Sequence, residues 1–427
     1  MAARAPASAH LATRLLLVAC TSLPLPLGAQ GVLTLQEALR EARMANAMLP
    51  VARFDTVIAR ARIVEARGVL WPRLSAESDL HAGTPNRYTG NDARLQVVAD
   101  EDLYDGGALR AGIQVAEAQA RGTRARYRLA EKDLDFAVEL RYSELLKTEE
   151  ELTFRRAGIA RLRTYLASVQ ARQAAGQGVA DDVLKTQVRL SAATADLEDA
   201  ARRLDLARFE LNDLLGRAPD GPVELAPLPR PGPPPVDSTG EPWATAPDVR
   251  SAEADVDAAL SNVTVARAGR RPHLSFSADA GALPLFPGSE VGTGLNNGQG
   301  WGMEFTFSLS WPVWDAGVYR ARLDQARGGA ERARQVATAV RREARLEWRR
   351  ALAELGSRYR EVQIRSGNVP IAQDSYLRAE SLYRGGAATA LDVLDAFTQW
   401  LDASEAAAEA TLGYREAAAR LLRWGTP

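Results

Sequence analysis

Hydrophobic residues recur at every seventh position through three long stretches of this 427-residue chain. Sustained heptads predict long helices that pack against one another along their length, as in coiled coils. The first stretch lies in helix-favouring sequence from about residue 106 to 173, which corresponds to about 100 Å of helix at 1.5 Å per residue. The heptad positions are Val138, Leu145, Leu152, Ile159 and Leu166; Leu355, Val362, Val369, Tyr376 and Tyr383; and Val183, Leu190, Leu197, Leu204 and Leu211.

Shorter segments alternate between apolar and polar side chains. From Met303 to Val313 every second residue is apolar, and most residues between them are polar. A period of two predicts a β-strand with one apolar and one polar face. Segments 73–84 and 93–104 predict two further strands, separated by a polar turn. Glu101 and Asp102 interrupt the apolar face, so either that strand ends early or the two acids lie at a membrane–water boundary.

The chain is an internal duplication. "LYDGGALRA" (103–111) aligns with "VWDAGVYRA" (313–321) at an offset of 210, and "WPRLS" (71–75) aligns with "RPHLS" (271–275) at an offset of 200. Asp105 and Gly107 match Asp315 and Gly317 as strand-to-helix junctions. The turns "GQGVADDVLK" (176–185) and "GAATALDVLD" (386–395) repeat as well, again at an offset of 210. Self-similarity of this kind predicts two copies of one structural unit.

These boundaries divide the chain into five parts. Residues 1–29 are a predicted signal peptide, and 217–247 are a proline-rich linker in which a helix is not expected. The first repeat, 30–216, has a helix, a β-hairpin at 73–104 and a helical hairpin at 106–215. The second repeat, 248–427, has a helix, a β-hairpin at 273–313 and a helical hairpin at 317–424. A capping box of Thr34 and Glu37 begins the first helix, which is expected to run unbroken to about Leu70.

The N-terminal segment predicts export. Arg4 and Arg14 precede or flank an apolar run too short to span a bilayer, and cleavage is expected after Ala29. The alternative is lipid attachment at Cys20, the only cysteine, within "LVAC". Cleavage at Ala29 leaves a mature chain without a thiol, which excludes disulfides and cysteine catalysis.

Charge and composition exclude several functions. Lysine and arginine total 53 against 54 acidic residues, so nothing favours a nucleic-acid partner. The three histidines, His10, His81 and His273, are scattered, and no phosphate-binding loop, dinucleotide motif or nucleophile motif occurs in a suitable context. We therefore expect neither an enzyme nor a metal or other cofactor.

Four strands in one chain are too few to close a barrel. The alternation of apolar and polar faces fits a membrane β-barrel, and a strand edge left open in lipid is costly, so closure requires several copies. A cyclic trimer supplies twelve strands. Trp301 and Trp311 are candidates for an aromatic belt at the membrane interface, with simple core packing as the alternative. The predicted fold is mainly α with a membrane β part.

The duplicated order of elements resembles the TolC-like outer-membrane efflux proteins. The specific features are the two "[LV]-[YW]-D-x-G" junctions, the two "G-x5-D-V-L" turns and the proline-rich linker. The resemblance implies a homotrimer with a twelve-strand barrel in outer-membrane lipid and a twelve-helix tunnel in the periplasm. It also implies a periplasmic adaptor and an inner-membrane transporter as partners. The expected function is the exit duct of a tripartite efflux pump.

The two turns are the candidate functional site. Gly176 and Gly386 permit the left-handed backbone that such turns need. Asp392 and Asp395 lie three apart and therefore share a helix face, whereas the first repeat has Lys185 at the position of Asp395. In a trimer that face could present six carboxylates that attract cations and raise one another's pKa. The alternative is a solvated helix end.

The resemblance assigns roles to these residues. It implies that Asp392 and Asp395 form the pore constriction at the periplasmic entrance, where the adaptor docks. It also implies a tip link between the two hairpins through Tyr383 and Asp182. An arginine that the family uses for a similar link is replaced by Ala388, so we expect either a weaker link or one made by Arg384.

Two other functions within the channel class remain open, namely type I protein secretion and heavy-metal efflux. A periplasmic adaptor, which also has long helical hairpins, is an alternative of another class. An adaptor would carry one hairpin between compact β domains, whereas this chain predicts two hairpins with short strand pairs.

Overall fold

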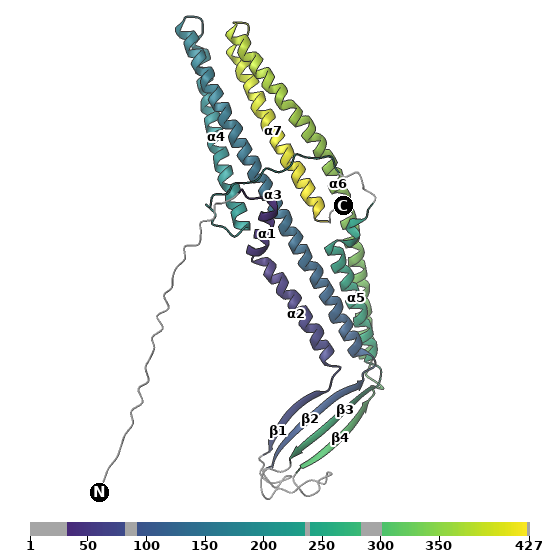
Figure 1. Cartoon of the computed structure of the whole chain (residues 1–427). Coiled ribbons are helices and arrows are strands. Elements are labelled where there is room, and N and C mark those ends of the chain that lie inside the picture. The colour runs from purple at the N-terminus through teal and green to yellow at the C-terminus, as the bar shows by residue number, and fades with distance from the viewer. Residues whose placement is uncertain (1–31, 82–91, 235–239, 283–300, 425–427) are drawn as a thin grey trace, which may run out of the picture.

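The computed structural model describes residues 32–81, 92–234, 240–282 and 301–424 (Figure 1). The predicted signal peptide, Cys20, the turn after the first strand and most of the long loop after the third strand lie outside these ranges. Figure 1 shows an elongated molecule with the strands at one end and the two helical hairpin tips at the other.

Seven α-helices, one 3-10 helix and four strands make up the described part of the chain. The helices are α1 (Leu35–Ala45), α2 (Met48–Gly68), α3 (Ala108–Ala174), α4 (Ala180–Leu214), η1 (Pro242–Thr245), α5 (Pro247–Ala268), α6 (Val318–Arg384) and α7 (Ala390–Leu422). The strands are β1 (Arg73–His81), β2 (Asp92–Tyr104), β3 (His273–Ala282) and β4 (Trp301–Ser310). The prediction of a mainly helical fold with β-hairpins is confirmed.

The long helices α3 and α6 each contain 67 residues, and they begin and end 210 residues apart. Helix α6 continues through Pro370, although proline removes one backbone hydrogen bond and disfavours a helix interior. Val362 and Tyr376 on either side are buried, so packing holds this part of the helix. Within the described ranges, no helix is both long enough and apolar enough to cross a membrane.

The heptad residues are the main contents of the core. Val138 and Leu145 have no exposed surface, and most other heptad positions are buried or half-buried. The heptad residues of α3 and α4, together with Tyr376 and Tyr383 of α6, belong to or pack against two separate clusters along α3. We call them the waist cluster, which includes Leu145 and Leu152 with α1, α4 and the linker, and the tip cluster, which includes Ile159 with α4, α6 and α7.

The four strands form one antiparallel sheet in the order β1-β2-β3-β4. The β2–β3 pairing joins the two repeats. β2 continues through Glu101 and Asp102, so the possibility that this strand ends before the acids is wrong. The register shifts between Asp102 and Tyr104, and the Asp102 carboxylate lies 3.0 Å from Nε2 of His273 on β3.

Two local expectations need correction. The first helix is not continuous to Leu70, because it breaks after Ala45 and restarts at Met48. The Asn46 side chain accepts hydrogen bonds from the backbone N–H groups of Met48 and Leu49 at 2.9 and 3.0 Å, and this local bond competes with the helix. The predicted linker also contains η1 near its end, and α5 begins at Pro247, a position that a first helical turn tolerates.

The linker is bound to the helices through its backbone. Leu33 and Leu225 form a parallel bridge, with Leu33 N–H donating to the Glu224 carbonyl at 2.7 Å. The Tyr142 hydroxyl of α3 lies 2.8 Å from the Leu33 carbonyl and 2.7 Å from that of Ala226. The Tyr414 hydroxyl of α7 donates to the Gly232 carbonyl at 2.8 Å. The linker therefore holds both hairpins at mid-height.

Gly317 and Gly328 allow a test of backbone conformation without steric change, because an added methyl group meets no atom within 4 Å at either position. Gly317 has φ +89°, so Gly317→Ala should destabilise the protein by about 1–2 kcal/mol. Gly328 lies inside α6, so Gly328→Ala should stabilise it by about 1 kcal/mol. Thermal unfolding followed by circular dichroism should give shifts of opposite sign, and shifts of the same sign would contradict this account.

Candidate functional site at the hairpin tips

Both hairpin turns have the same backbone hydrogen bonds. In the first, Gln177 N–H donates to the Arg172 carbonyl at 2.9 Å, and Gly176 N–H donates to Gln173. In the second, the corresponding bonds join residues 387 to 382 and 386 to 383. Gly176 and Gly386 have φ of +72° and +75°, the left-handed conformation that ends a helix in a Schellman motif. The two glycines therefore do what the sequence predicts.

The helix that follows the turn begins differently in the two repeats. In α7, Thr389 and Asp392 form a capping box: the Thr389 N–H and hydroxyl donate to the Asp392 carboxylate at 2.8 and 2.7 Å. In α4 the capping position is Val179, which has no side-chain hydrogen bond. Asp392 and Asp395 are both exposed, and their neighbours Val393 and Leu394 are buried, so the two aspartates share the solvent face of α7.

The capping box determines the titration of Asp392 in the single chain. Hydrogen bonds from the Thr389 N–H and hydroxyl lower the pKa of the Asp392 carboxyl below its ordinary value. The sequence-based expectation of a raised pKa concerned carboxylates gathered in a trimer, and it does not describe the isolated chain. A group that stays ionised at neutral pH keeps its full negative charge at the start of α7, where the helix dipole favours an anion.

In the first repeat the acids are occupied by other partners. Asp181 forms an ion pair with Lys185 at 2.7 Å, and this contact raises the pKa of the Lys185 ammonium group. Asp182, in the first turn of α4, lies beside Tyr383 of the second hairpin. The pKa of the Tyr383 hydroxyl is raised, first by burial and then by the negative charge of Asp182. The structure therefore brings the two residues of the predicted tip link together.

Arg172 is a residue of this site that sequence reasoning missed. Its Nη1 donates to the carbonyls of Tyr383 and Arg384 at 2.5 and 3.1 Å, and its guanidinium lies 5.0 Å from the centre of the Tyr383 ring. The Tyr383 ring is also in edge contact with the Tyr165 ring, with ring centres 5.4 Å apart. Arg384, the expected alternative, instead pairs with Glu380 on its own helix, so that expectation is wrong.

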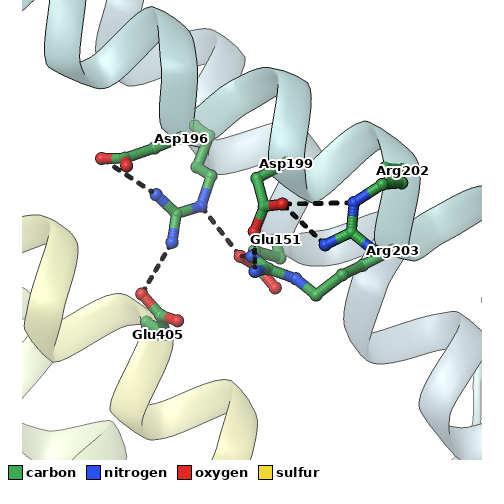
Figure 2. A network of polar contacts seen from close by, with 7 residues as sticks. Glu151, Asp196, Asp199, Arg202, Arg203 and Glu405 are labelled. Atoms are coloured by element: carbon green, nitrogen blue, oxygen red, sulfur yellow. Dashed lines mark hydrogen bonds and ion pairs between the residues drawn. The ribbon is translucent and has the colours of Figure 1, made fainter.

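Further from the tip, a polar network joins three helices (Figure 2). Glu151 of α3 is almost fully buried and accepts hydrogen bonds from Arg155, at 2.8 Å, and from Arg203 of α4. Arg155 also donates to Glu405 of α7 at 2.8 Å and lies 3.8 Å from Asp196 of α4. Two guanidinium groups thus compensate the buried carboxylate, which would otherwise be costly to bury.

Arg161 completes a series of α3 arginines that reach the second hairpin. Its guanidinium lies 4.7 Å from the centre of the Trp400 ring of α7. Arg155, Arg161 and Arg172 therefore contact, in order toward the tip, a carboxylate, an aromatic ring and two backbone carbonyls. Together with the tip cluster, they hold the two hairpins of one chain against each other.

The predicted junction residues begin the two long helices. Asp105 accepts hydrogen bonds from the backbone N–H groups of Gly107, at 2.9 Å, and Leu109, and Asp315 does the same for Gly317 and Tyr319. Gly107 and Gly317 both have positive φ, at +95° and +89°. The repeated Asp-x-Gly motif thus caps each helix where it leaves the sheet.

The two predicted interface tryptophans lie at opposite ends of β4. Trp301 is its first residue, and its side chain lies outside the described part of the structure. Trp311 follows the strand, is 63% exposed, and donates through Nε1 to the Arg270 carbonyl at 3.2 Å. Trp311 is not packed in a core within the chain.

The capping box gives a pH-dependent prediction. Because the folded pKa of Asp392 is lowered, its hydrogen bonds add stability above the ordinary pKa of about 4 and lose it as the pH falls through the folded value. Thr389→Val should therefore lower the melting temperature at pH 7, and the difference from the wild type should shrink near pH 3. Val179→Ala, at the uncapped start of α4, should show no such pH dependence. An equal Thr389→Val effect at both pH values would contradict the role of the carboxylate.

Comparison with known proteins identifies the chain. The family described as outer membrane efflux protein matches residues 38–217 and 243–424. The outer membrane efflux protein BepC of Brucella suis biovar 1 (strain 1330) is 22% identical over 364 residues, which cover 85% of this chain and 78% of BepC.

Solved structures share the fold. The open-state outer membrane channel MtrE of Neisseria gonorrhoeae has a TM-score of 0.79 and 23% identity, over 91% of this chain and 88% of MtrE. The outer membrane protein VceC of Vibrio cholerae has a TM-score of 0.79 and 18% identity, over 91% of this chain and 95% of VceC. The match of both repeats sets aside the periplasmic adaptor alternative. The chain belongs to the outer membrane efflux protein family, where it serves as an outer-membrane efflux duct and not as an enzyme.

Proposed function

We propose that three copies of this chain close into one continuous tube, which is the exit duct of a tripartite efflux pump. The proposal is based on one observation. The sheet and both halves of the helical part each end in two open edges, one from each repeat. The sheet ends at β1 on one side and β4 on the other. Open strand edges invite pairing, and in lipid they must be paired. Three copies supply twelve strands, enough for a closed barrel.

The helices have open edges in the same sense. In the half of the molecule near the tips, the helices lie side by side in the order α4, α3, α7, α6. In the half near the sheet, the order is α2, α3, α5, α6 (Figure 1). The outer helices carry exposed apolar side chains that face no partner within the described chain. On α2 they include Met48, Phe54 and Val64; on α4, Leu184 and Val188; and on α6, Ile364 and Ile371.

Unlike edges favour a ring. In the sheet and in both helical halves, the edge that comes from the first repeat differs from the edge that comes from the second. Copies therefore associate head to tail, with the first edge of one copy against the second edge of the next. A head-to-tail contact that closes on itself gives a cyclic assembly. The duplication supports a regular closure, because the contact between copies resembles the contact between repeats.

The ring has a membrane end and a periplasmic end. β4 presents Phe305, Phe307 and Leu309 as exposed apolar residues, which suits contact with outer-membrane lipid. Trp311 lies at the helical end of that strand, where an aromatic side chain suits the interface. The long helices extend from there into the periplasm, after export by the signal peptide. A periplasmic adaptor at the hairpin tips and an inner-membrane transporter complete the pump.

The hairpin tips form the entrance of the duct. Asp392 and Asp395 lie on the exposed face of α7, and in a trimer six such carboxylates surround the axis. They form the constriction and favour cations. The tip link is made by Asp182 and Tyr383, together with Arg172, and it keeps the two hairpins of each chain together near the constriction.

Single-channel recording in planar bilayers tests the proposal. The purified protein should insert and give a small, cation-selective conductance. Asp392→Asn/Asp395→Asn should increase the conductance and reduce the cation selectivity. The loss of selectivity should be at most about 10-fold, because water and salt in the hydrated pore screen the charges beyond a short distance. Asp181→Asn provides the control from the first repeat, because Asp181 pairs with Lys185 and lies outside the proposed tip link, and the selectivity of this variant should change less. An absence of insertion and current would contradict the duct, and unchanged selectivity in the first variant would place the constriction elsewhere.

The tip link makes a separate prediction. Arg172→Gln removes the charged donor to the Tyr383 and Arg384 carbonyls and should raise the closed-state conductance. Tyr383→Phe should have the same direction with a smaller effect, because the aromatic contacts with Tyr165 and Arg172 remain. Arg163→Gln, an exposed arginine on the same helix, is the control. Equal currents in all three variants and the wild type would refute the link.

A further inference from the structure

A basic hollow lies where α3 and α5 pack together, in the half of the molecule near the sheet. Its volume is about 320 Å³. We call it the arginine hollow, because it is lined by Arg121, Arg124 and Arg128 of α3 and by Arg250 of α5, together with the acids Glu253 and Asp257 of α5.

Both acids of the arginine hollow already have partners. Asp257 pairs with Arg121 at 2.8 Å, and Glu253 pairs with Arg341 of the neighbouring helix α6. These two carboxylates are therefore neutralised by arginines of the flanking helices, and they leave the other arginines of the hollow uncompensated.

Three guanidinium groups remain free to bind a ligand. Arg124, Arg128 and Arg250 are exposed, and none of them forms an ion pair with the described residues. The adjacent segment of α6, residues 318–350, carries ten arginines against four acidic residues, so the surrounding field is positive as well. Each free guanidinium can hold a carboxylate through two parallel hydrogen bonds.

The linker shows on which side of the helical layer the hollow lies. Thr245, at the end of η1, lines the hollow. On α3, Arg128 and Tyr142 are two heptads apart and share a face, and the Tyr142 hydroxyl lies 2.7 Å from the carbonyl of the linker residue Ala226. Three linkers inside a tube would obstruct it, so in the proposed duct, on which this step rests, the linker side is the outer wall.

The hollow lies beyond the reach of the membrane that holds the sheet. Arg121 and Arg128 follow Gly107, where α3 leaves the sheet, by about 20–30 Å of helix. The headgroup layer on each side of a bilayer is only about 5–8 Å thick. The arginine hollow of the proposed duct therefore faces the periplasm and not lipid headgroups.

The lining of the hollow favours a hydrated polymer over a protein partner. Among the described residues that line it, none is a large apolar one, whereas the core of a protein–protein interface is rich in aromatic and apolar side chains. Exposed guanidinium groups suit carboxylates. The periplasmic polymer that the duct has to pass, and whose peptide stems carry carboxylates, is the peptidoglycan of the cell wall.

We propose that the arginine hollow binds carboxylates of peptidoglycan and anchors the outer wall of the duct to the cell wall. A ring of three copies presents three such hollows to one continuous polymer. Contacts that are weak singly then add, because binding at one hollow raises the effective concentration of carboxylates at the others. Anchoring from outside leaves the passage open.

Sedimentation of the detergent-solubilised protein with purified peptidoglycan sacculi tests the proposal. The wild type should sediment with the sacculi at low salt and be released at about 1 M salt, where charges are screened beyond about 3 Å. Arg124→Gln/Arg128→Gln/Arg250→Gln should lower the apparent affinity by about 10-fold or more, because three charged contacts per copy are lost.

Two control variants separate the hollow from general charge. Arg156→Gln/Arg163→Gln/Arg360→Gln removes the same number of exposed arginines away from the hollow and should bind as the wild type does. A variant with lysine in place of Arg124, Arg128 and Arg250 keeps the charge and should bind better than the glutamine variant. Sacculi whose carboxylates have been converted to amides should not bind the wild type.

Several results would overturn the anchor. They are equal binding by the two glutamine variants, binding that survives amidation of the sacculi, and no sedimentation of the wild type with sacculi, which would leave an acidic protein as the occupant to test. Loss of binding in the lysine variant equal to that in the glutamine variant would exclude charge as its basis.

Single-channel recording checks the outer-wall position independently. Arg124→Gln/Arg128→Gln/Arg250→Gln should keep the wild-type conductance and ion selectivity, because the hollow does not line the passage. A changed selectivity would place these arginines in the lumen and overturn the anchor. Absence of any current from the wild type would count against the proposed duct, whereas the sedimentation comparison would still decide whether the hollow binds peptidoglycan.

Discussion

Burial of the apolar face of α3 is the interaction on which the rest of the structure depends. A helix of 67 residues gains most of its stability from packing, and α3 contacts α1, α2, α4, α5 and α7. Its heptad residues serve the waist cluster in one part of its length and the tip cluster in another. Glu151 lies next to Leu152 of the waist cluster and is compensated by Arg155 and Arg203. The same helix therefore contributes apolar side chains to both clusters and also holds the buried ion pairs of Glu151 with Arg155 and Arg203.

The regular parts of this architecture were predictable because they depend on local and periodic signals. Heptads locate the buried faces of the long helices, alternation locates β4, and the paired Asp-x-Gly motifs mark where each long helix begins. The capping box of Thr34 and Glu37 is present with both of its hydrogen bonds. Gly176 and Gly386 have the predicted left-handed backbone, because a Schellman turn requires it whatever the surrounding fold.

The parts that were not predictable depend on which elements meet in space. Nothing local to Arg172 indicates that its guanidinium reaches carbonyls 211 and 212 positions away. Arg384 lies closer to the second turn and carries the same charge, yet its side chain forms an ion pair with Glu380, one turn earlier on its own helix. The break at Asn46 was missed for the opposite reason, because a purely local contact decided it. The Asn46 side chain accepts hydrogen bonds from the backbone N–H groups of Met48 and Leu49 at the start of α2, and these bonds outweighed the helical pattern around them. The assembled entrance involves other copies, so the roles of Asp392 and Asp395 remain proposals.

The linker between the repeats has a consequence for how freely this chain can change. Tyr142 and Tyr414 hold it through the main-chain carbonyls of Ala226 and Gly232, and Leu33 pairs with it through backbone groups. Bonds of this kind do not depend on which side chains the linker carries. Apart from apolar positions such as Leu225, which packs in the waist cluster, selection on this segment should therefore act on its course and length more than on its residue identities. Related chains can then diverge here while their two hairpins stay in register.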